Sequence, residues 1–394
     1  MGKLGMDVRD ASRGGCWRWL TQRHSGHLLL AAILLTLLTV PAQETPSLTI
    51  DEDTQAFAIA PDRSVAFTTA KLKSFDKIVI ERDEVWIASP KGGKRRIVEP
   101  DKFMPVPPPF TYIVRSILWS PDSRRLALSM LTKQYPWAPK VKGKKRGSLD
   151  DDEDDNTKEG ASGPPPSGTG NVLALLDQDG SEIKVAGGKT RFIEGVQSGT
   201  WLADGKTVVY LNGSGQLERV EPDTGKTAEL FEGKRFDGIA WDARNNRAYA
   251  VGQGLSITGR QVLVQLDLVR ESVNEITRLD AFQGGLTVSP SGKTVGYFRD
   301  GDTIEARALA NPTKPMSVRT GPGRFEFDRD DRRVLLKRGP ADKSNDLVWV
   351  DLTSGTFRPI LHDLIYHDFH ISPDGTMLGV VAVGRGTLAL YPLE

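Results

Sequence analysis

One short unit recurs along the chain, and this recurrence limits the possible folds more than any other feature. Each copy has an apolar strand, a tight turn that often reads Pro-Asp or Asp-Gly, usually a basic residue, and a second apolar strand. Proline fixes φ at the first turn position, and Asp or Asn tolerates the next one. An isolated hairpin cannot bury two apolar faces, so the copies have to stack on one another. The turn position falls at Pro61, Pro121, Ala203, Ala243, Pro290, Arg329 and Pro373.

The spacing of the copies indicates a ring of blades. Seven copies, most of them about 40–60 residues apart, match the repeat length of a β-propeller. A second hairpin follows most copies, with Asp-Gly, Thr-Gly or Gly-Gly at its tip. These hairpins are expected at Val85–Val98, Val172–Val185, Gln216–Leu230, Val262–Ile276 and Leu347–Leu361. Two hairpins make one blade, so residues 47–394 are predicted to form an all-β propeller of about seven four-stranded blades.

The two ends of the repeat region complement each other. The last copy stops after Thr387–Leu393, one strand short of a full blade. The segment Ser47–Asp51 is an apolar strand without a hairpin partner of its own. We expect it to pair as the missing outer strand of the last blade and to close the ring, because closure removes an edge that invites aggregation.

One copy carries a family resemblance. The sequence ILWSPDSRRLA, at Ile117–Ala127, is similar to the Pro-Asp repeat of TolB-like and WD-like propellers, and it also resembles the propeller half of prolyl-oligopeptidase-like proteins. Copies four and six depart from the pattern, because Asp242–Asn245 and Asp328–Asp330 lack the proline. The resemblance covers most of the repeat region and implies a propeller that recognises a partner. It does not imply one particular function, because propellers carry out many tasks.

The N-terminus has the features of a signal peptide. The uncharged apolar run Leu28–Val40 is shorter than the roughly 18–20 residues that a membrane-spanning helix needs. Val40 and Ala42 occupy the −3 and −1 positions of a cleavage site, and three arginines precede the run, namely Arg13, Arg18 and Arg23. We predict a signal peptide at residues 1–42 and a periplasmic or secreted protein. An uncleaved membrane anchor is the alternative; after cleavage the chain would not be an integral membrane protein.

Charge and cysteine content exclude several classes of function. Lys+Arg number 52 and Asp+Glu 51, so the net charge is close to zero and does not attract the chain to nucleic acid. Cys16 is the only cysteine and lies in the predicted leader. The mature chain is therefore expected to have no disulfide, no thiol nucleophile and no cysteine metal site.

A low-complexity insertion is expected within the second blade, at residues 133–170. A basic block is followed there by the acidic run Asp150–Asp155 and then by Gly, Ser and Pro. Such a composition cannot bury a core, so the insertion is predicted to be disordered. It is either a tolerated surface loop or a tether for a partner or for divalent cations.

Equivalent positions of the copies predict a binding site at the channel mouth. The residue six positions before the turn should begin the innermost strand; these residues are Gln55, Arg115, Gln197, Asp237, Gly284, Gly323 and His367. The next position is mostly small, as crowding near an axis requires, but it includes Arg324 and Asp368. Polar groups that converge on a concave mouth indicate a binding site. The predicted ligand or partner site contains Arg115, Gln197, Asp237, Arg324, His367 and Asp368; alternatively, these residues only solvate a water-filled channel.

The chain lacks the common catalytic motifs. No Gly-x-Ser-x-Gly elbow and no HExxH sequence is present, and the GKT triplets lie at hairpin turns without the earlier glycine of a phosphate loop. His362, His367 and His370 alternate with Asp363 and Asp368, but strand alternation points His367 away from His370. We therefore predict no catalytic residue, no metal and no cofactor.

Together these features predict an exported, non-catalytic propeller that acts as a monomer. Its partner is expected to be a protein or a cell-envelope component bound at the ring face, and not a nucleic acid. The main alternative is a propeller hydrolase or lyase that uses channel-mouth carboxylates such as Asp237 and Asp368. A further alternative is a relic or subunit of a peptidase.

Overall fold

The structure is a computed structural model that describes residues 46–75, 78–103, 110–135, 168–183, 192–252, 261–338, 347–361, 366–382 and 386–393. The chain divides into two compact units, Met1–Glu44 and Thr45–Glu394, and all of these residues belong to the second. The predicted signal peptide lies outside the described residues, as does most of the insertion at 133–170. Among the described residues, no helix is long and apolar enough to cross a membrane.

Five sheets have four antiparallel strands each. The first contains β10 (Val196–Trp201), β11 (Val208–Asn212), β12 (Leu217–Glu221) and β13 (Lys226–Leu230). The second contains β14 (Gly238–Asp242), β15 (Arg247–Gly252), β16 (Val262–Asp267) and β17 (Ser272–Arg278). The third contains β18 (Gly284–Val288), β19 (Thr294–Phe298), β20 (Thr303–Ala308) and β21 (Met316–Arg319). The fourth contains β22 (Gly323–Phe327), β23 (Arg333–Arg338), β24 (Leu347–Asp351) and β25 (Phe357–Leu361). The fifth contains β26 (Tyr366–Ile371), β27 (Met377–Ala382), β28 (Leu388–Pro392) and β1 (Leu48–Ile50).

The other eight strands form a single sheet. They are β2 (Thr54–Ile59), β3 (Val65–Phe75), β4 (Ile78–Ala88), β5 (Lys94–Val98), β6 (Phe110–Trp119), β7 (Arg125–Gln134), β8 (Gly168–Asp177) and β9 (Phe192–Glu194). Their order is β2-β3-β4-β6-β7-β8-β9, and β5 pairs with β4 beside this path. All neighbours are antiparallel except β4 and β6, which meet in a parallel pairing at Arg82 and Tyr112. The ends of the predicted insertion, at 133–134 and 168–170, belong to β7 and β8 and pair with each other.

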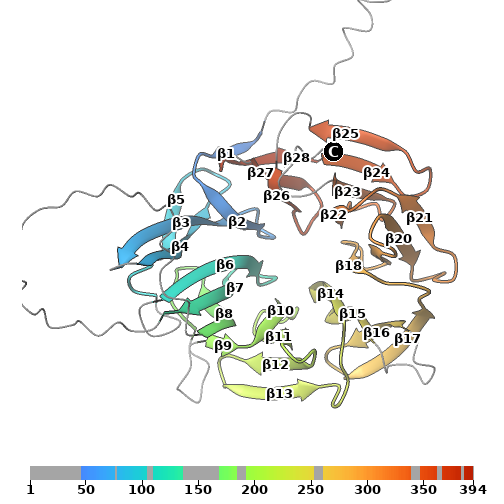
Figure 1. Ribbon diagram of the computed structural model, residues 1–394, viewed down its shortest axis with the longest axis horizontal. Helices are drawn as coiled ribbons and strands as arrows, with labels where there is room; N and C mark the ends of the chain where they lie inside the picture. Colours follow the sequence, from blue (N-terminus) through green and yellow to red (C-terminus); the bar gives the residue numbers. More distant parts are fainter. Residues whose placement is uncertain are drawn as a thin grey trace, which may run out of the picture. The chain divides into compact units, whose positions relative to one another are not determined.

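The prediction of seven four-stranded blades is wrong. The described part of the chain has five four-stranded sheets, and its remaining sheet has eight strands. The cause is the length of β4, whose 11 residues continue well before the four that pair with β5. This extra length allows Arg82 to pair with β6. The all-β propeller architecture is confirmed: within this unit, β2, β6, β10, β14, β18, β22 and β26 lie nearest to a common centre (Figure 1).

The N-terminal strand pairs with the last sheet. Leu48 lies opposite Leu390, and Ser47 donates its backbone N–H to the Leu390 carbonyl at 2.7 Å. The strand β1 is therefore the outer neighbour of β28, as the predicted pairing of Ser47–Asp51 requires. The pairing covers the edge of β28 but does not by itself show that the strand closes a ring of blades.

The repeated turns link paired strands at all seven positions. The third turn residue adopts a left-handed φ even where it is not glycine, as at Arg63 and Asp331. Copy four uses a short 3-10 turn, Ala243–Asn245, followed by the left-handed Asn246. Copies four and six thus form hairpins as well. In the hairpin expected at Val172–Val185, Glu182 forms an isolated bridge with Leu176 of β8, and residues 184–185 lie outside the described part. The described strand that pairs with β8 beyond this bridge is β9.

Apolar side chains hold neighbouring sheets together. One cluster joins Ala127 and Leu173 of the eight-stranded sheet to Trp201 and Tyr210 of the next, and Trp201 is fully buried. Burial of apolar surface contributes about 25 cal/mol per Å². This packing uses both faces of each sheet, which explains why the repeated strands are apolar on both sides.

Candidate functional site

Three residues of the predicted site are the extra residues of β-bulges. The registers of β6–β7, β10–β11 and β26–β27 shift at the same relative position of the repeat. The residues left without a cross-strand partner are Arg115, Gln197 and His367. A bulge redirects a side chain and interrupts the ladder, and bulges are frequent next to functional sites. The position selected from the sequence therefore coincides with a β-bulge on these three innermost strands.

Four residues of the predicted site differ in their surroundings. The Arg115 side chain is exposed and has no hydrogen bond or ion pair with any residue in the described ranges. Gln197 is also exposed, and its Nε2 donates to the Gly213 carbonyl at 3.3 Å. Asp237 lies just before β14, where its backbone N–H donates to the Val251 carbonyl at 2.7 Å and its carboxylate is exposed. His367 lies on β26, and its side chain is outside the described part.

The structure brings Arg324 and Asp368 together in a charge cluster that also contains Glu326 and His370. Arg324 forms an ion pair with Asp368 through Nη1, and its Nη2 lies 2.7 Å from Oε1 of Glu326. Nδ1 of His370 is 2.9 Å from the same Glu326 oxygen, and its Nε2 is 3.4 Å from Oδ2 of Asp368. Residues two apart on a strand share a face, so β22 and β26 each contribute one pair. The cluster links two neighbouring sheets.

The cluster fixes the charge of its members. Burial disfavours the imidazolium of His370, but the carboxylates of Glu326 and Asp368 outweigh burial and raise the His370 pKa to about 9. Burial would raise the Asp368 pKa, yet the hydrogen bond and charge of His370, together with Arg324, hold that pKa well below its usual range. The Glu326 pKa is lowered in the same way, against the effect of burial. At neutral pH both carboxylates are ionised and His370 is protonated.

Arg324 is the member of the cluster that faces solvent most. Its side chain is 46% exposed, whereas those of Glu326 and Asp368 are 21% and 20% exposed. Lys337 lies across the strand pair from Arg324, and burial lowers the Lys337 pKa despite the nearby Asp368. The cluster therefore presents a half-exposed guanidinium whose orientation is fixed by partly buried carboxylates.

A pocket of about 310 Å³ adjoins the cluster at Glu326. Its walls come from the ends of β14, β18, β22 and β26 and from the turns that follow three of them. Trp241, Phe327 and Pro373 supply apolar surface. Arg244 reaches Pro373, a residue of a distant repeat, and donates to its backbone carbonyl. The pocket is thus a concave surface built from four repeats.

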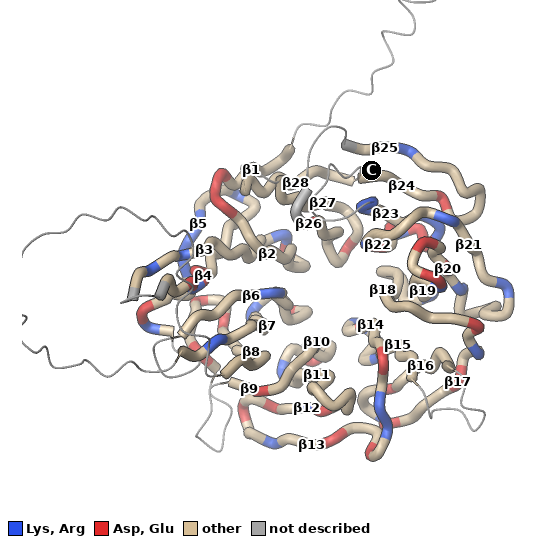
Figure 2. The backbone as a smooth tube through the Cα atoms, viewed as in Figure 1, with Lys and Arg blue, Asp and Glu red and all other residues tan. Residues whose placement is uncertain are grey.

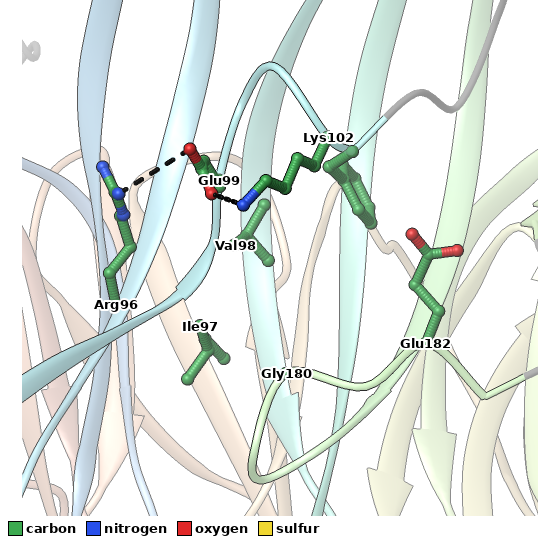
Figure 3. A pocket seen from close by; sticks show the side chains of 8 residues that line it. Arg96, Ile97, Val98, Glu99, Lys102, Gly180 and Glu182 are labelled. Carbon is green, nitrogen blue, oxygen red and sulfur yellow. Dashed lines mark ion pairs between the residues drawn. The ribbon is translucent and has the colours of Figure 1, made fainter.

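A second pocket, of about 300 Å³, lies in the eight-stranded sheet (Figure 3). It lies beside β5 and the turn at Gly180, and none of the predicted site residues lines it. Its basic residues are engaged: Nζ of Lys102 is 2.6 Å from Glu99, and Arg96 is 2.8 Å from Glu84. A ligand would have to break these pairs, so this pocket is the weaker candidate.

The described residues contain no group of three or more His, Cys, Asp or Glu side chains arranged to hold a metal ion. His362 and Asp363 lie outside the described residues. Glu326 was not selected from the sequence, and His370 was considered only as a metal ligand. Residues two apart on a strand share a face, so strand alternation from Arg324 would have indicated Glu326, and alternation from Asp368 would have indicated His370.

Comparisons with known proteins concern the fold. No family model matches the chain, and no curated protein matches its sequence. A chain of the Mitotic Checkpoint Complex has a TM-score of 0.52 at 12% identity, with 97% of this chain and 99% of that chain covered. The Cps50 (Swd1) β-propeller domain of Myceliophteria thermophila has a TM-score of 0.54 at 12% identity, with 89% and 100% covered.

TolB from Acinetobacter baumannii is also similar, with a TM-score of 0.40 at 14% identity and coverage of 84% of this chain and 80% of that chain. So low a score does not confirm the specific TolB-like resemblance. The likeness to the checkpoint-complex and Cps50 structures supports the β-propeller fold.

Proposed function

We propose that this chain is a non-catalytic protein-interaction scaffold that binds a protein or a cell-envelope component at its innermost strands. The observation that carries the proposal is the pair of exposed bulge residues Arg115 and Gln197, together with the half-exposed Arg324 of the charge cluster. Arg115 is unpaired among the described residues, and Arg324 is held in place by its partners. Arginines of this kind suit recognition of carboxylates and backbone carbonyls. One structural neighbour is a chain of the Mitotic Checkpoint Complex, a protein assembly, which fits the same class of function.

The charge distribution favours a protein partner over nucleic acid. Basic and acidic residues are interspersed over the strands of this unit rather than gathered in one patch (Figure 2). A phosphate backbone would require a continuous basic surface. A protein partner needs only a few well-placed anchors.

The charge cluster disfavours the alternative of a hydrolase or lyase. A general acid or base works best with a pKa near the operating pH. The pKa values of Glu326 and Asp368 are lowered by His370 and Arg324, and that of His370 is raised to about 9. These three groups hold their charges throughout the neutral range, which suits a fixed electrostatic link better than proton transfer.

Export remains part of the proposal through the apolar run Leu28–Val40 and the cleavage positions Val40 and Ala42. We infer that the mature chain begins near residue 43 and acts as a monomer in the periplasm or outside the cell. Intact-mass measurement of the protein recovered from the envelope would locate its N-terminus. Recovery of the uncleaved chain in the membrane fraction would support the anchor alternative.

Quantitative capture of envelope proteins tests the binding proposal. Wild-type protein would be compared with Arg115→Ala plus Gln197→Ala, a variant that leaves the charge cluster intact. Arg270→Ala, an exposed change outside the innermost strands that also removes one positive charge, is the matched control. We expect the first variant to lose specific partners and the control to retain them. Equal recovery of every partner by all three proteins would contradict a binding site at the innermost strands.

A further inference from the structure

The hairpin of β3 and β4 extends beyond the strand that precedes it. The pairing of β2 with β3 ends at Thr54 and Thr69, whereas β4 pairs with β3 as far as Phe75 and Ile78. From Ala70 onward, β3 therefore has β4 on one side and no described strand on the other. Figure 1 shows this hairpin projecting from its sheet. Alternate N–H and C=O groups along the free side are available to another strand.

The side chains along this edge alternate in character. Lys71 and Lys73 share one face of β3, and Leu72 lies on the other. Leu72 is 68% exposed and Val79, on the neighbouring strand, is 61% exposed, and they are the two most exposed large hydrophobic side chains of the described residues. The Lys73 ammonium lies 3.0 Å from Asp101, but this ion pair is exposed and contributes little. The edge thus offers positive charge on one face and uncovered apolar surface on the other.

We propose that the β3 edge at residues 70–74 binds an extended acidic segment of a partner protein by strand addition. The partner's backbone would extend the sheet, its acidic residues would lie next to Lys71 and Lys73, and its apolar residues would cover Leu72 and Val79. Strand addition obtains affinity from main-chain hydrogen bonds and specificity from alternate side chains. This surface is separate from the residues proposed for binding on the innermost strands.

Charge selects this occupant over a second copy of the chain. Pairing of two β3 edges would bring Lys71 and Lys73 of one copy close to the same residues of the other, and like charges across a sheet are destabilising. Edge lysines also protect sheets against self-association. Such protection does not explain why Leu72 and Val79 are exposed beside them, whereas a partner strand with apolar residues does.

The probe for this proposal is a labelled peptide in which glutamate and valine alternate, titrated with the full chain by fluorescence anisotropy. We expect saturable binding. The same peptide with N-methylated backbone amides at alternate residues should lose it, because it cannot complete the ladder. A lysine–valine peptide should not bind. Equal binding of the N-methylated peptide, or no binding of the glutamate–valine peptide, would overturn the proposal.

Variants of the edge complete the test. Lys71→Glu plus Lys73→Glu should weaken binding of the acidic peptide by about tenfold, because two favourable cross-strand pairs become repulsive. Lys226→Glu, a single substitution of the same kind on the outer strand β13, should leave binding unchanged. If the double variant does not fold, Leu72→Ser tests the apolar face and should also weaken binding. A dimer of the full chain in sedimentation that Leu72→Ser abolishes would assign the edge to a second copy instead.

Discussion

Two carboxyl groups, Asp83 of the eight-stranded sheet and Asp368 of the charge cluster, have pKa values that are shifted in opposite directions. Asp83 on β4 is completely buried, and one of its oxygens accepts the Val114 N–H at 2.6 Å. Its other oxygen has no hydrogen-bond partner among the described residues. Burial raises the Asp83 pKa to about 7, although the Val114 bond opposes the rise. The Asp368 pKa is instead held low by His370 and Arg324.

The comparison shows that the supply of positive charge decides the state of a buried acid. Desolvation disfavours the carboxylate at both places. Two cationic partners reverse its effect at Asp368, whereas Asp83 has a single neutral donor on its carboxyl group. The Asp368 site is an ionic link between two sheets. The Asp83 site is a proton-binding group next to the pairing of Arg82 with Tyr112 that joins β4 to β6.

The two carboxyl groups therefore contribute oppositely to the pH dependence of stability, whereas His370 follows the same direction as Asp83. The Asp83 pKa is higher in the folded chain, so its contribution falls as pH rises from about 4 to about 7. The His370 pKa is also raised, so its stabilisation is fully present below about pH 6.5 and is lost as pH rises towards about 9. The Asp368 pKa is lowered, and its contribution is lost as pH falls below about 4.

Replacement of His370 by leucine should produce the largest effect. The variant leaves two partly buried carboxylates, Glu326 and Asp368, with Arg324 as the only cation of the cluster, and removing one charge of such a group is destabilising. Because the His370 side chain is 34% exposed, solvent screens part of the lost interaction, and we expect the free energy of unfolding to fall by roughly 2–3 kcal/mol at pH 7. Urea denaturation measures the change, with the exposed Lys91→Ala as control. The deficit should shrink between pH 7 and pH 9, and a constant deficit would mean that lost packing, not charge, is responsible.

Asp83→Asn should have the next largest effect and the opposite sign. Asparagine keeps an acceptor for the Val114 N–H and removes the need to ionise a buried group. We expect the variant to be about 2 kcal/mol more stable than wild type at pH 8 and almost equal to it at pH 4. Thermal or urea unfolding across this range measures the difference. A gain of equal size at both pH values would show that Asp83 does not titrate within it.

The repeated hairpins could be predicted from the sequence because their cause is local. Turn residues set φ, and apolar runs on both sides set the strands, so even Ala243 and Arg329 mark real hairpins. The joining of β4 to β6 was not foreseen. It depends on strands that continue to Phe75 and Ile78, well past the apolar repeat, and on a long-range pairing at Tyr112.

The candidate site was predictable only in part, for a similar reason. Arg324 and Asp368 occupy equivalent positions on neighbouring repeats, and the structure joins them in an ion pair. The comparison of equivalent positions gave no hint of the register shifts at Arg115 and Gln197, because a bulge arises from how two paired strands fit. It also overlooked Glu326, which lies one alternation further along the strand and is needed to hold both Arg324 and His370.

Tyr112→Phe should distinguish the contribution of the Asp83 backbone from that of the Asp83 carboxyl group. The Tyr112 hydroxyl donates to the Asp83 carbonyl at 2.8 Å and not to its carboxyl group. Loss of this buried bond should cost about 1 kcal/mol at every pH between 4 and 8. Unfolding of this variant is compared with that of Asp83→Asn at the same pH values. A cost that changes with pH would mean that the hydroxyl acts on the titrating carboxyl group.

Arg324→Gln should have the smallest effect on stability and the most specific effect on His370. The Arg324 side chain is 46% exposed, so solvent screens much of its charge, and we expect a loss of about 1 kcal/mol or less. Its positive charge lowers the His370 pKa, so removing that charge should raise this pKa above its value of about 9. NMR titration of the His370 ring measures the shift directly. A fall in this pKa would mean that Arg324 acts mainly by holding Glu326 and Asp368 against the imidazole. In that case geometry, rather than the number of positive charges, would be the reason that the Asp368 pKa differs from the Asp83 pKa.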